Sequence, residues 1–354
     1  MNMNVGLNLL RIVLTLGVIM DHFWWTAEPG KLQGADIALW QLRTLAVPAF
    51  MTMTFFFTAK RFVGGDVAWL KKRYLRLYTP FIFWAVACFL VTSLVARFDP
   101  SRYSASFTDL LWQVAFGHSK RLSLTQFWFH TDLFLLTAVF FAVFRLVRSP
   151  KAVMYVALCA IAVGFTVQYS PWMMKALVGW MPYEMKPPLG RVFPMLPCAG
   201  VGLLLAMVKD RLDAASPGVR VAVAAMGLWL VAWVIYAPVA ARPESVVGYE
   251  GVNMPLIAWG MIAAFYYIPF DRLPASLTKA VMFLSRYCMG VYCIHLLMGK
   301  ILFDHVFHLT RTETPYGAIT VAPGWFWLLL WAVSYFVCYL ISLIPGSFSK
   351  RIVE

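Results

Sequence analysis

The sequence has few charged residues, because Asp, Glu, Lys and Arg make up only 13% of its 354 positions. A typical soluble domain has about 25%. Hydrophobic residues make up 61% of the chain. This composition excludes an ordinary soluble enzyme, although the length alone would allow two soluble domains. The net charge of +14 does not indicate a nucleic-acid partner, since the cytoplasmic loops of membrane proteins carry an excess of Lys and Arg.

The chain also lacks the patterns of several other protein classes. No internal repeat, low-complexity tract or separate polar domain interrupts it, so residues 1–354 are expected to form a single integral membrane domain. The six cysteines lie in apolar segments without the spacing of a metal site, so no metal ligands are predicted. No Asn-x-Ser/Thr glycosylation sequence occurs, which favours a bacterial inner membrane.

Long uncharged segments are abundant. Five of them contain at least 20 residues: 77–96, 152–174, 221–241, 251–270 and 321–345. A helix needs about 20 apolar residues to cross the hydrocarbon core of a bilayer. With shorter segments included, we predict an all-α bundle of about ten transmembrane helices. The expected spans are 5–25, 40–59, 77–96, 127–147, 152–170, 191–208, 220–241, 252–270, 280–301 and 322–345.

The distribution of basic residues predicts the orientation of this bundle. With a cytoplasmic N-terminus, the inner loops and their borders hold 16 Lys and Arg, whereas the longer outer loops hold 11. The positive-inside rule therefore places both termini in the cytoplasm. The longest outer connection is 98–126, in which 109–116 is expected to form a short surface helix.

Eight ionisable residues within the expected spans are singled out as candidates. Such residues are costly in a bilayer and indicate function by default. Arg11 and His22 are eleven residues apart, so on a helix they differ by about 20° around the axis and by about 16 Å along it. Asp21 points about 100° away from His22, so we do not expect it to orient that histidine. The full set is Arg11, Asp21, His22, His130, Asp132, Arg286, His295 and Lys300.

The spacing of Arg11 and His22 resembles the Arg-x10-His signature of acyltransferase family 3, a family of multi-pass membrane acyltransferases. Three later segments resemble further motifs of this family, in the family's order. They are LKKRYLRLYTPFIFW with Arg73, Arg76 and Pro80, QFWFHTDLFLL with Trp128, and SRYCMGVYCIHLLMG with Gly290, Tyr292 and His295.

The end of the second span departs from the family, which often has Ser-Gly-Phe or Ser-Gly-Tyr there. This chain has Thr58, Ala59 and Lys60 in the segment FFFTAKRF. A glycine that permits close approach of two backbones is therefore missing from this helix.

The resemblance implies transfer of an acyl group, usually acetyl from acetyl-CoA, to a hydroxyl group of a carbohydrate or glycolipid in the cell envelope. His22 is then the expected general base, although a covalent acyl-histidine intermediate stays open. Arg11 is expected either to hold part of the donor or to stabilise negative charge on the thioester oxygen. A purely structural alternative is that Arg11 pairs with a carboxylate and His22 borders a water pocket.

The basic segment is the expected donor site. Arg73 and Arg76 are three residues apart and would share one face of a helix, and the fork of an arginine suits phosphate. Lys72 adds positive potential beside them. The alternative is contact with anionic lipid headgroups.

Four further residues are predicted with less support to contact the substrate. Trp128 would stack on a sugar, and Asp132 would orient a histidine. His130 and His295 complete this set. The structural alternatives are a tryptophan of the interfacial belt and a hydrogen-bonded histidine between helices.

Two other classes of function compete with an acyltransferase. A transporter or flippase of a polysaccharide or lipid-linked glycan would have broken helices in two matching halves, and the sequence shows no such halves. A scaffolding subunit would leave Arg11 and His22 without a role.

Overall fold

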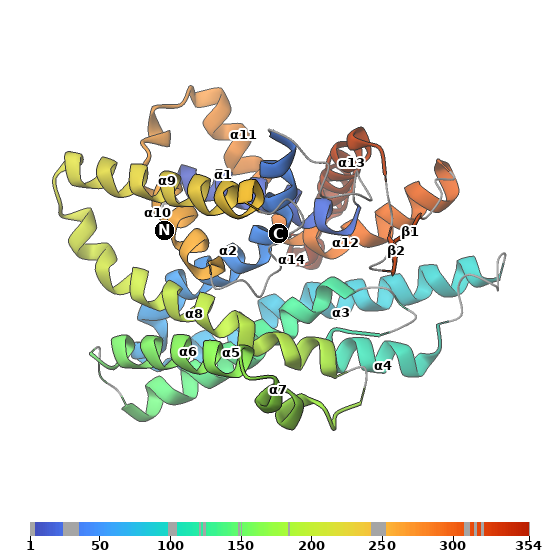
Figure 1. The fold of residues 1–354 in the computed structure, drawn as a ribbon. Helices are drawn as coiled ribbons and strands as arrows, with labels where there is room; N and C mark the ends of the chain where they lie inside the picture. The colour runs from blue at the N-terminus through green and yellow to red at the C-terminus, as the bar shows by residue number, and fades with distance from the viewer. Residues whose placement is uncertain are drawn as a thin grey trace.

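Apolar segments of this chain form helices, because a segment inside a bilayer must satisfy its own backbone hydrogen bonds. The computed structural model describes residues 4–23, 35–97, 105–119, 122, 125–147, 149, 151–182, 185–241, 253–307, 312–314, 317–319 and 322–353. Its α-helices (Figure 1) are α1 Val5–His22, α2 Ala35–Gly64, α3 Val67–Ala96, α4 Phe107–Phe116, α5 Trp128–Val147, α6 Ala152–Gln168, α7 Pro171–Val178, α8 Lys186–Asp213, α9 Pro217–Ala241, α10 Met254–Tyr267, α11 Ala275–Arg286, α12 Cys288–Lys300, α13 Gly324–Leu343 and α14 Ser347–Val353.

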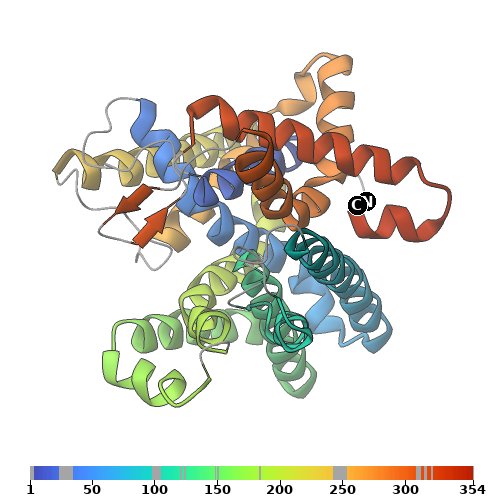
Figure 2. The same cartoon turned by 90° about the vertical axis from the view of Figure 1, so that its right-hand side faces the viewer.

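Short elements complete the fold. The 3-10 helices are η2 Thr125–Phe127 and η3 Phe270–Arg272, and a π-helical turn, η4 Ile301–Val306, continues α12. The strands β1 Thr312–Thr314 and β2 Gly317–Ile319 pair antiparallel, with Glu313 opposite Ala318. This hairpin lies at the end of the molecule that faces the viewer in Figure 2.

The multi-pass prediction is confirmed. Among the described residues, six helices are long and apolar enough to cross a membrane, or eight when each bent pair is counted as one span. The apolar segments 217–233 and 254–267, in α9 and α10, are shorter. Every predicted span coincides with one of these helices or pairs, so "about ten" is an approximate count. The predicted surface helix at 109–116 is also present, as α4.

Sharp bends occur at two predicted spans. The fifth, 152–170, ends where α6 meets α7 at 94°, and Pro171 opens the new helix. Proline suits this first position because it lacks a backbone N–H, and an N–H there would have no helical partner. The ninth consists of α11 and α12, which meet at 61°. Arg286 was expected inside that span, but it lies exposed at the break.

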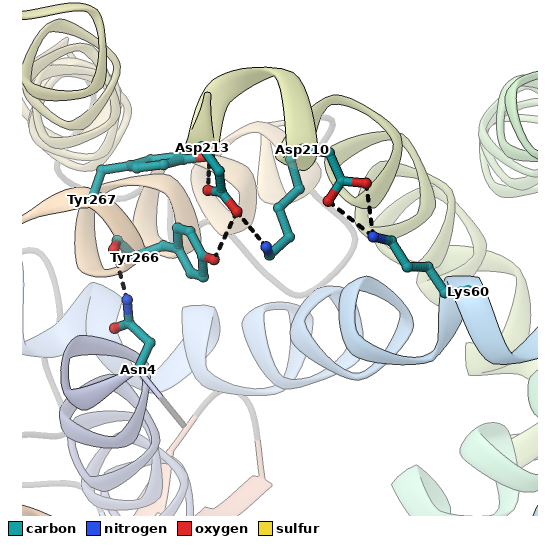
Figure 3. Close-up of polar contacts among 7 residues, drawn as sticks. Asn4, Lys60, Asp210, Asp213, Tyr266 and Tyr267 are labelled. Carbon is teal, nitrogen blue, oxygen red and sulfur yellow. Dashed lines mark hydrogen bonds and ion pairs between the residues drawn. The ribbon is translucent and has the colours of Figure 1, made fainter. Parts of the chain in front are cut away.

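A polar network fastens four helices together at one end of the bundle (Figure 3). Lys60 of α2 binds both carboxylate oxygens of Asp210 of α8, at 2.9 and 2.7 Å. Asp213 accepts hydrogen bonds from Lys209 and from the Tyr266 and Tyr267 hydroxyls of α10. The Asn4 amide, which precedes α1, donates to the Tyr266 carbonyl at 2.8 Å. The ends of α1, α2, α8 and α10 therefore lie together.

The close approach of α2 to its neighbour uses a glycine of the other helix. A Cβ atom at Gly202 of α8 would overlap the carbonyl oxygen of Thr52 in α2. The motif position where the family often has glycine carries the buried Ala59, and the adjacent Lys60 forms the ion pair with Asp210. Gly202 thus provides a close contact that the second span's own motif lacks.

The last helix turns back into the bundle. Gly346 has φ of +124°, a conformation that favours glycine, and it precedes α14. The Trp84 indole of α3 donates to the Ile352 carbonyl at 2.9 Å, and both Ile352 and Val353 are buried. This short helix therefore packs against α3, α12 and α13.

Candidate active site

The two histidines His22 and His295 meet where the end of α1 packs against α12. Their ring centres are 5.3 Å apart and the ring planes are tilted by 35°. His22 is partly exposed, whereas His295 is fully buried. The structure thus brings the expected general base together with one of the residues predicted with less support.

Close packing fixes the position of α12 on either side of His295. A Cβ atom at Gly290 would lie 2.7 Å from the Val353 carbonyl oxygen. At Gly299 a Cβ atom would overlap the ring of Phe23, the residue that follows His22. Phe23 also packs on Phe326 of α13, with ring centres 5.4 Å apart. The two glycines therefore permit the approach that places the histidine rings in contact.

His295 is oriented by the backbone of its own helix. Its Nδ1 lies 2.8 Å from the Tyr292 carbonyl oxygen and 3.2 Å from that of Val291. A carbonyl oxygen only accepts, so Nδ1 carries a proton and donates it. Nε2 has no hydrogen-bond partner among the described residues. One nitrogen of this buried ring is therefore satisfied and the other is left for a further contact.

The positive charge of two arginines reaches His22. The charges of Arg191 and Arg43 both act on this histidine. Arg191 comes from the first turns of α8, and its guanidinium carbon lies 4.5 Å from the centre of the Trp128 ring. Its charge also acts on Asp132 and Tyr292. Arg191 thus lies among side chains from α1, α5 and α12.

Arg43 of α2 has a different environment. It is buried, and its Nη1 lies 3.2 Å from Oδ1 of Asp21. Asp21 was expected to point away from His22, and its ion pair is indeed with α2. Because the pair brings opposite charges together, most of the Arg43 charge is compensated, whereas Arg191 stacks on an aromatic ring.

Sequence reasoning missed Arg43 and Arg191. Arg43 lies inside the predicted span 40–59, and Arg191 is the first residue of 191–208, but neither was among the candidates. The criterion that selected the other candidates, an ionisable residue within an apolar segment, would have selected these two as well.

Asp132 and Trp128 lie on α5 beside Arg191. Asp132 is fully buried, and neither of its carboxylate oxygens has a hydrogen-bond partner in the described part of the chain. Trp128 is also buried, and the Arg191 guanidinium covers one face of its ring. Arg191 therefore occupies one ring face of Trp128, on which a sugar was expected to stack. Asp132, by contrast, has two acceptor atoms without partners among the described residues.

His130 lies in an aromatic enclosure. Its ring centre is 5.2 Å from that of Tyr292, 5.5 Å from that of Phe127 and 5.6 Å from that of Phe81. It is buried, and within the described residues neither ring nitrogen has a hydrogen-bond partner. Tyr292 also lies close to His295, with ring centres 6.1 Å apart, so it neighbours both histidines.

Arg11 lies three turns away from His22 on the same helix, at a rise of about 16 Å. It is half-buried, and its charge acts on Tyr335 of α13, whose hydroxyl lies 3.2 Å from the Cys288 sulfur. Cys288 precedes His295 by seven residues, so the two lie about 10 Å apart along the axis of α12. His22 thus contacts α12 at His295, whereas the charge of Arg11 acts on Tyr335 of α13.

The basic segment forms the first turns of α3. Asp66 caps this helix by accepting from the N–H groups of Ala68 and Trp69, at 2.8 and 3.1 Å. Arg73 is buried, with its guanidinium carbon 5.7 Å from the centre of the Trp69 ring. Its Nε and Nη2 have no hydrogen-bond partner among the residues that the structure describes.

The neighbours of Arg73 point outward. Lys72 and Arg76 are exposed, although the Arg76 charge still acts on Arg73. The helix face predicted to carry both arginines therefore has Arg73 buried and Arg76 exposed. This segment follows directly on the end of α2 that carries Lys60, so it lies at the opposite end of the bundle from His22.

The arrangement provides the parts of a group-transfer site. A partly exposed imidazole can remove a proton, a guanidinium beside it can bind an oxyanion, and a buried carboxylate can accept hydrogen bonds from hydroxyl groups. Within the described ranges, no group of three or more His, Cys, Asp or Glu side chains is arranged to hold a metal ion.

Comparison with known proteins identifies the family. The profile of the family described as "Acyltransferase domain" matches residues 4–343, a range that contains every candidate residue above. No curated protein and no solved structure matches the chain. Because the family match covers nearly the whole sequence, the protein belongs to acyltransferase family 3, the multi-pass membrane acyltransferases.

Proposed function

We propose that the protein transfers an acetyl group from cytosolic acetyl-CoA to a hydroxyl group of a cell-envelope carbohydrate or glycolipid. One observation carries this proposal: the partly exposed His22 lies against the buried His295, with the positive charge of Arg191 acting on it. A base beside a cation is what attack of a hydroxyl group on a thioester requires.

His22 acts as the general base in this reaction. A sugar hydroxyl attacks the thioester carbon and gives its proton to His22, while the carbonyl π electrons move to the oxygen. When the carbonyl re-forms, the carbon–sulfur bond breaks, and the protonated His22 returns the proton to the CoA thiolate. The products are the acetyl ester and CoA, and His22 is regenerated.

The two arginines that face this reaction have different tasks. An oxyanion-stabilising group must lie within hydrogen-bond reach of the thioester oxygen. Arg11 is about 16 Å along α1 from His22. Arg191 therefore stabilises the oxyanion, and Arg11 holds part of the donor.

The donor phosphates bind at the first turns of α3. Two nitrogen atoms of the buried Arg73 have no partner among the described residues, and a phosphate group would satisfy them. The exposed Lys72 and Arg76 add positive potential around it. This segment and His22 lie at opposite ends of the bundle, so the donor must extend between them past Arg11.

The acceptor binds at the His22 end. Asp132 accepts hydrogen bonds from sugar hydroxyls through its unused oxygens. Trp128 supports the site through Arg191, which covers its ring face. His130 lines the same end from within its aromatic enclosure.

The orientation follows from the charge count. Both termini and the basic segment face the cytoplasm, where acetyl-CoA is found, and the histidine pair faces the outer side of a bacterial inner membrane. The membrane lipid surrounds the bundle, and neither a metal nor a nucleic acid takes part.

A deletion strain provides the test. We expect it to lose an acetyl ester from an envelope carbohydrate, to regain the ester with wild-type protein and not with His22→Ala. His22→Ala should keep its CoA affinity, because a base does not hold the donor. Loss of the whole surface carbohydrate would instead support a flippase. An unchanged ester content, together with purified protein that neither binds CoA nor hydrolyses acetyl-CoA, would refute the proposal.

A further inference from the structure

A buried acceptor atom of His295 lies in the ring that contacts His22. His295 Nε2 is fully buried without a hydrogen-bond partner in the described residues, and the rings of the two histidines are in contact. We propose that His295 is the positioning residue of the reaction: its Nε2 accepts the N–H of His22 and thereby aims the other His22 nitrogen at the acceptor hydroxyl. This inference rests on the proposed function, in which His22 is the base.

The backbone of α12 decides which nitrogen of His295 is available. Nδ1 lies 2.8 Å from the Tyr292 carbonyl and must donate to it. In the neutral ring, Nε2 then has no proton and only accepts. This arrangement resembles the carboxylate of a Ser-His-Asp triad in its role, because a fixed acceptor behind the base selects one tautomer of the catalytic ring.

The distance between the rings permits the contact. Centres 5.3 Å apart leave the facing nitrogen atoms within hydrogen-bond reach once the His22 ring turns about its Cβ–Cγ bond. That torsion is broad in histidine, so the rotation needs no movement of either helix. His22 takes up the proton of the acceptor hydroxyl and later releases it to the thiolate, and His295 neither gains nor loses a proton.

The carboxylates near the site have other recorded interactions. Asp21 forms an ion pair with Arg43 of α2. The positive charge of Arg191 acts on Asp132, which lies on α5. Among the described residues, His295 is recorded in contact with the His22 ring, so it is placed to hold this ring.

Two amide substitutions separate a positioning role from a packing role. Glutamine places an amide group near the position of Nε2, and asparagine places one near Nδ1. If His295 positions His22, His295→Gln should retain more activity than His295→Asn. If the histidine serves only to bond the Tyr292 carbonyl, the order should be reversed.

The experiment measures acetyl transfer by purified full-length protein, with kcat and KM determined separately. His295→Asn and His295→Phe should lower kcat by about 100-fold, the upper range for loss of a residue that orients an essential group. KM for acetyl-CoA should stay unchanged, and His295→Gln should recover about a tenth of wild-type kcat. Cys293→Ala, a buried change on the same helix, should leave kcat unchanged and serves as the packing control.

The outcomes distinguish the transferase function from the positioning role of His295. Wild-type protein without transferase activity overturns the proposed function, and the positioning role with it. Active protein in which His295→Asn equals or exceeds His295→Gln, or in which His295→Phe keeps wild-type kcat, overturns the positioning role alone.

Discussion

Replacing Arg191 by alanine removes the guanidinium that lies over Trp128 and acts on His22. If this group stabilises the oxyanion, its loss should lower kcat by about 10²–10³-fold, the usual effect of removing one such donor. The same change at Arg11 should be much milder in kcat. At an effective dielectric constant of about 20, a charge about 16 Å away contributes about 1 kcal/mol, against about 4 kcal/mol at about 4 Å.

A difference of about 1 kcal/mol corresponds to about a fivefold change in rate. Arg11→Ala should therefore act mainly on KM for acetyl-CoA, and Arg191→Ala mainly on kcat. The assay follows transfer of labelled acetyl groups by purified protein over a range of donor concentrations. Millimolar guanidinium ion should restore part of the Arg191→Ala activity, because it can occupy the space above Trp128.

A matched control is available on the same helix. Lys186 lies in the first turn of α8 and is exposed, so Lys186→Ala removes one positive charge without touching the site. It should leave both constants unchanged. The reasoning is refuted if Arg191→Ala keeps wild-type kcat, or if Arg11→Ala lowers kcat equally at unchanged KM.

Three further predictions concern the rest of the molecule. Arg73→Ala should weaken CoA binding, and the loss should be larger at low salt. Arg73→Lys should recover only part of the CoA affinity, because the bidentate fork is lost. If wild-type and variant proteins bind CoA equally well, the segment contacts lipid headgroups instead. In a protein without native cysteines, a cysteine at the exposed Thr108 of α4 should react with an impermeant reagent in intact cells, and one at the exposed Ser276 of α11 only after permeabilisation; the reverse would invert the orientation. Trp84→Phe leaves a buried carbonyl of α14 without its donor and should cost about 1–3 kcal/mol, seen as a lower Tm. Trp229→Phe on the exposed face of α9 should leave Tm unchanged.

The spans could be predicted from the sequence because their signal is local. Run length and apolarity alone locate α3, α6 and α13, and the apolar pattern around Asp109 locates α4. The bends could not be predicted in this way, since the uncharged segment 152–174 runs across the first bend and the predicted span 280–301 runs across the second. The exposure of Arg286 follows from the second bend and was missed for the same reason.

The candidate site could be predicted only in part. Asp132 and the two histidines stand out individually, because ionisable residues are rare in apolar segments. Their arrangement depends on which helices touch, and α1 meets α12 through contacts far apart in the chain. Arg191 was missed since it stands at the edge of a span, where a basic residue is ordinarily an interfacial anchor.

The glycines that hold α12 in place have a consequence for genetics. Gly290 packs on the Val353 carbonyl and Gly299 on the Phe23 ring, so any larger residue at either position must displace the helix that carries His295. A shift of about 1 Å in a reacting group can cost about 100-fold in rate. In a saturation screen scored by acetylation, we therefore expect both glycines to tolerate as few substitutions as the histidines, although neither has a side chain that could take part in the reaction.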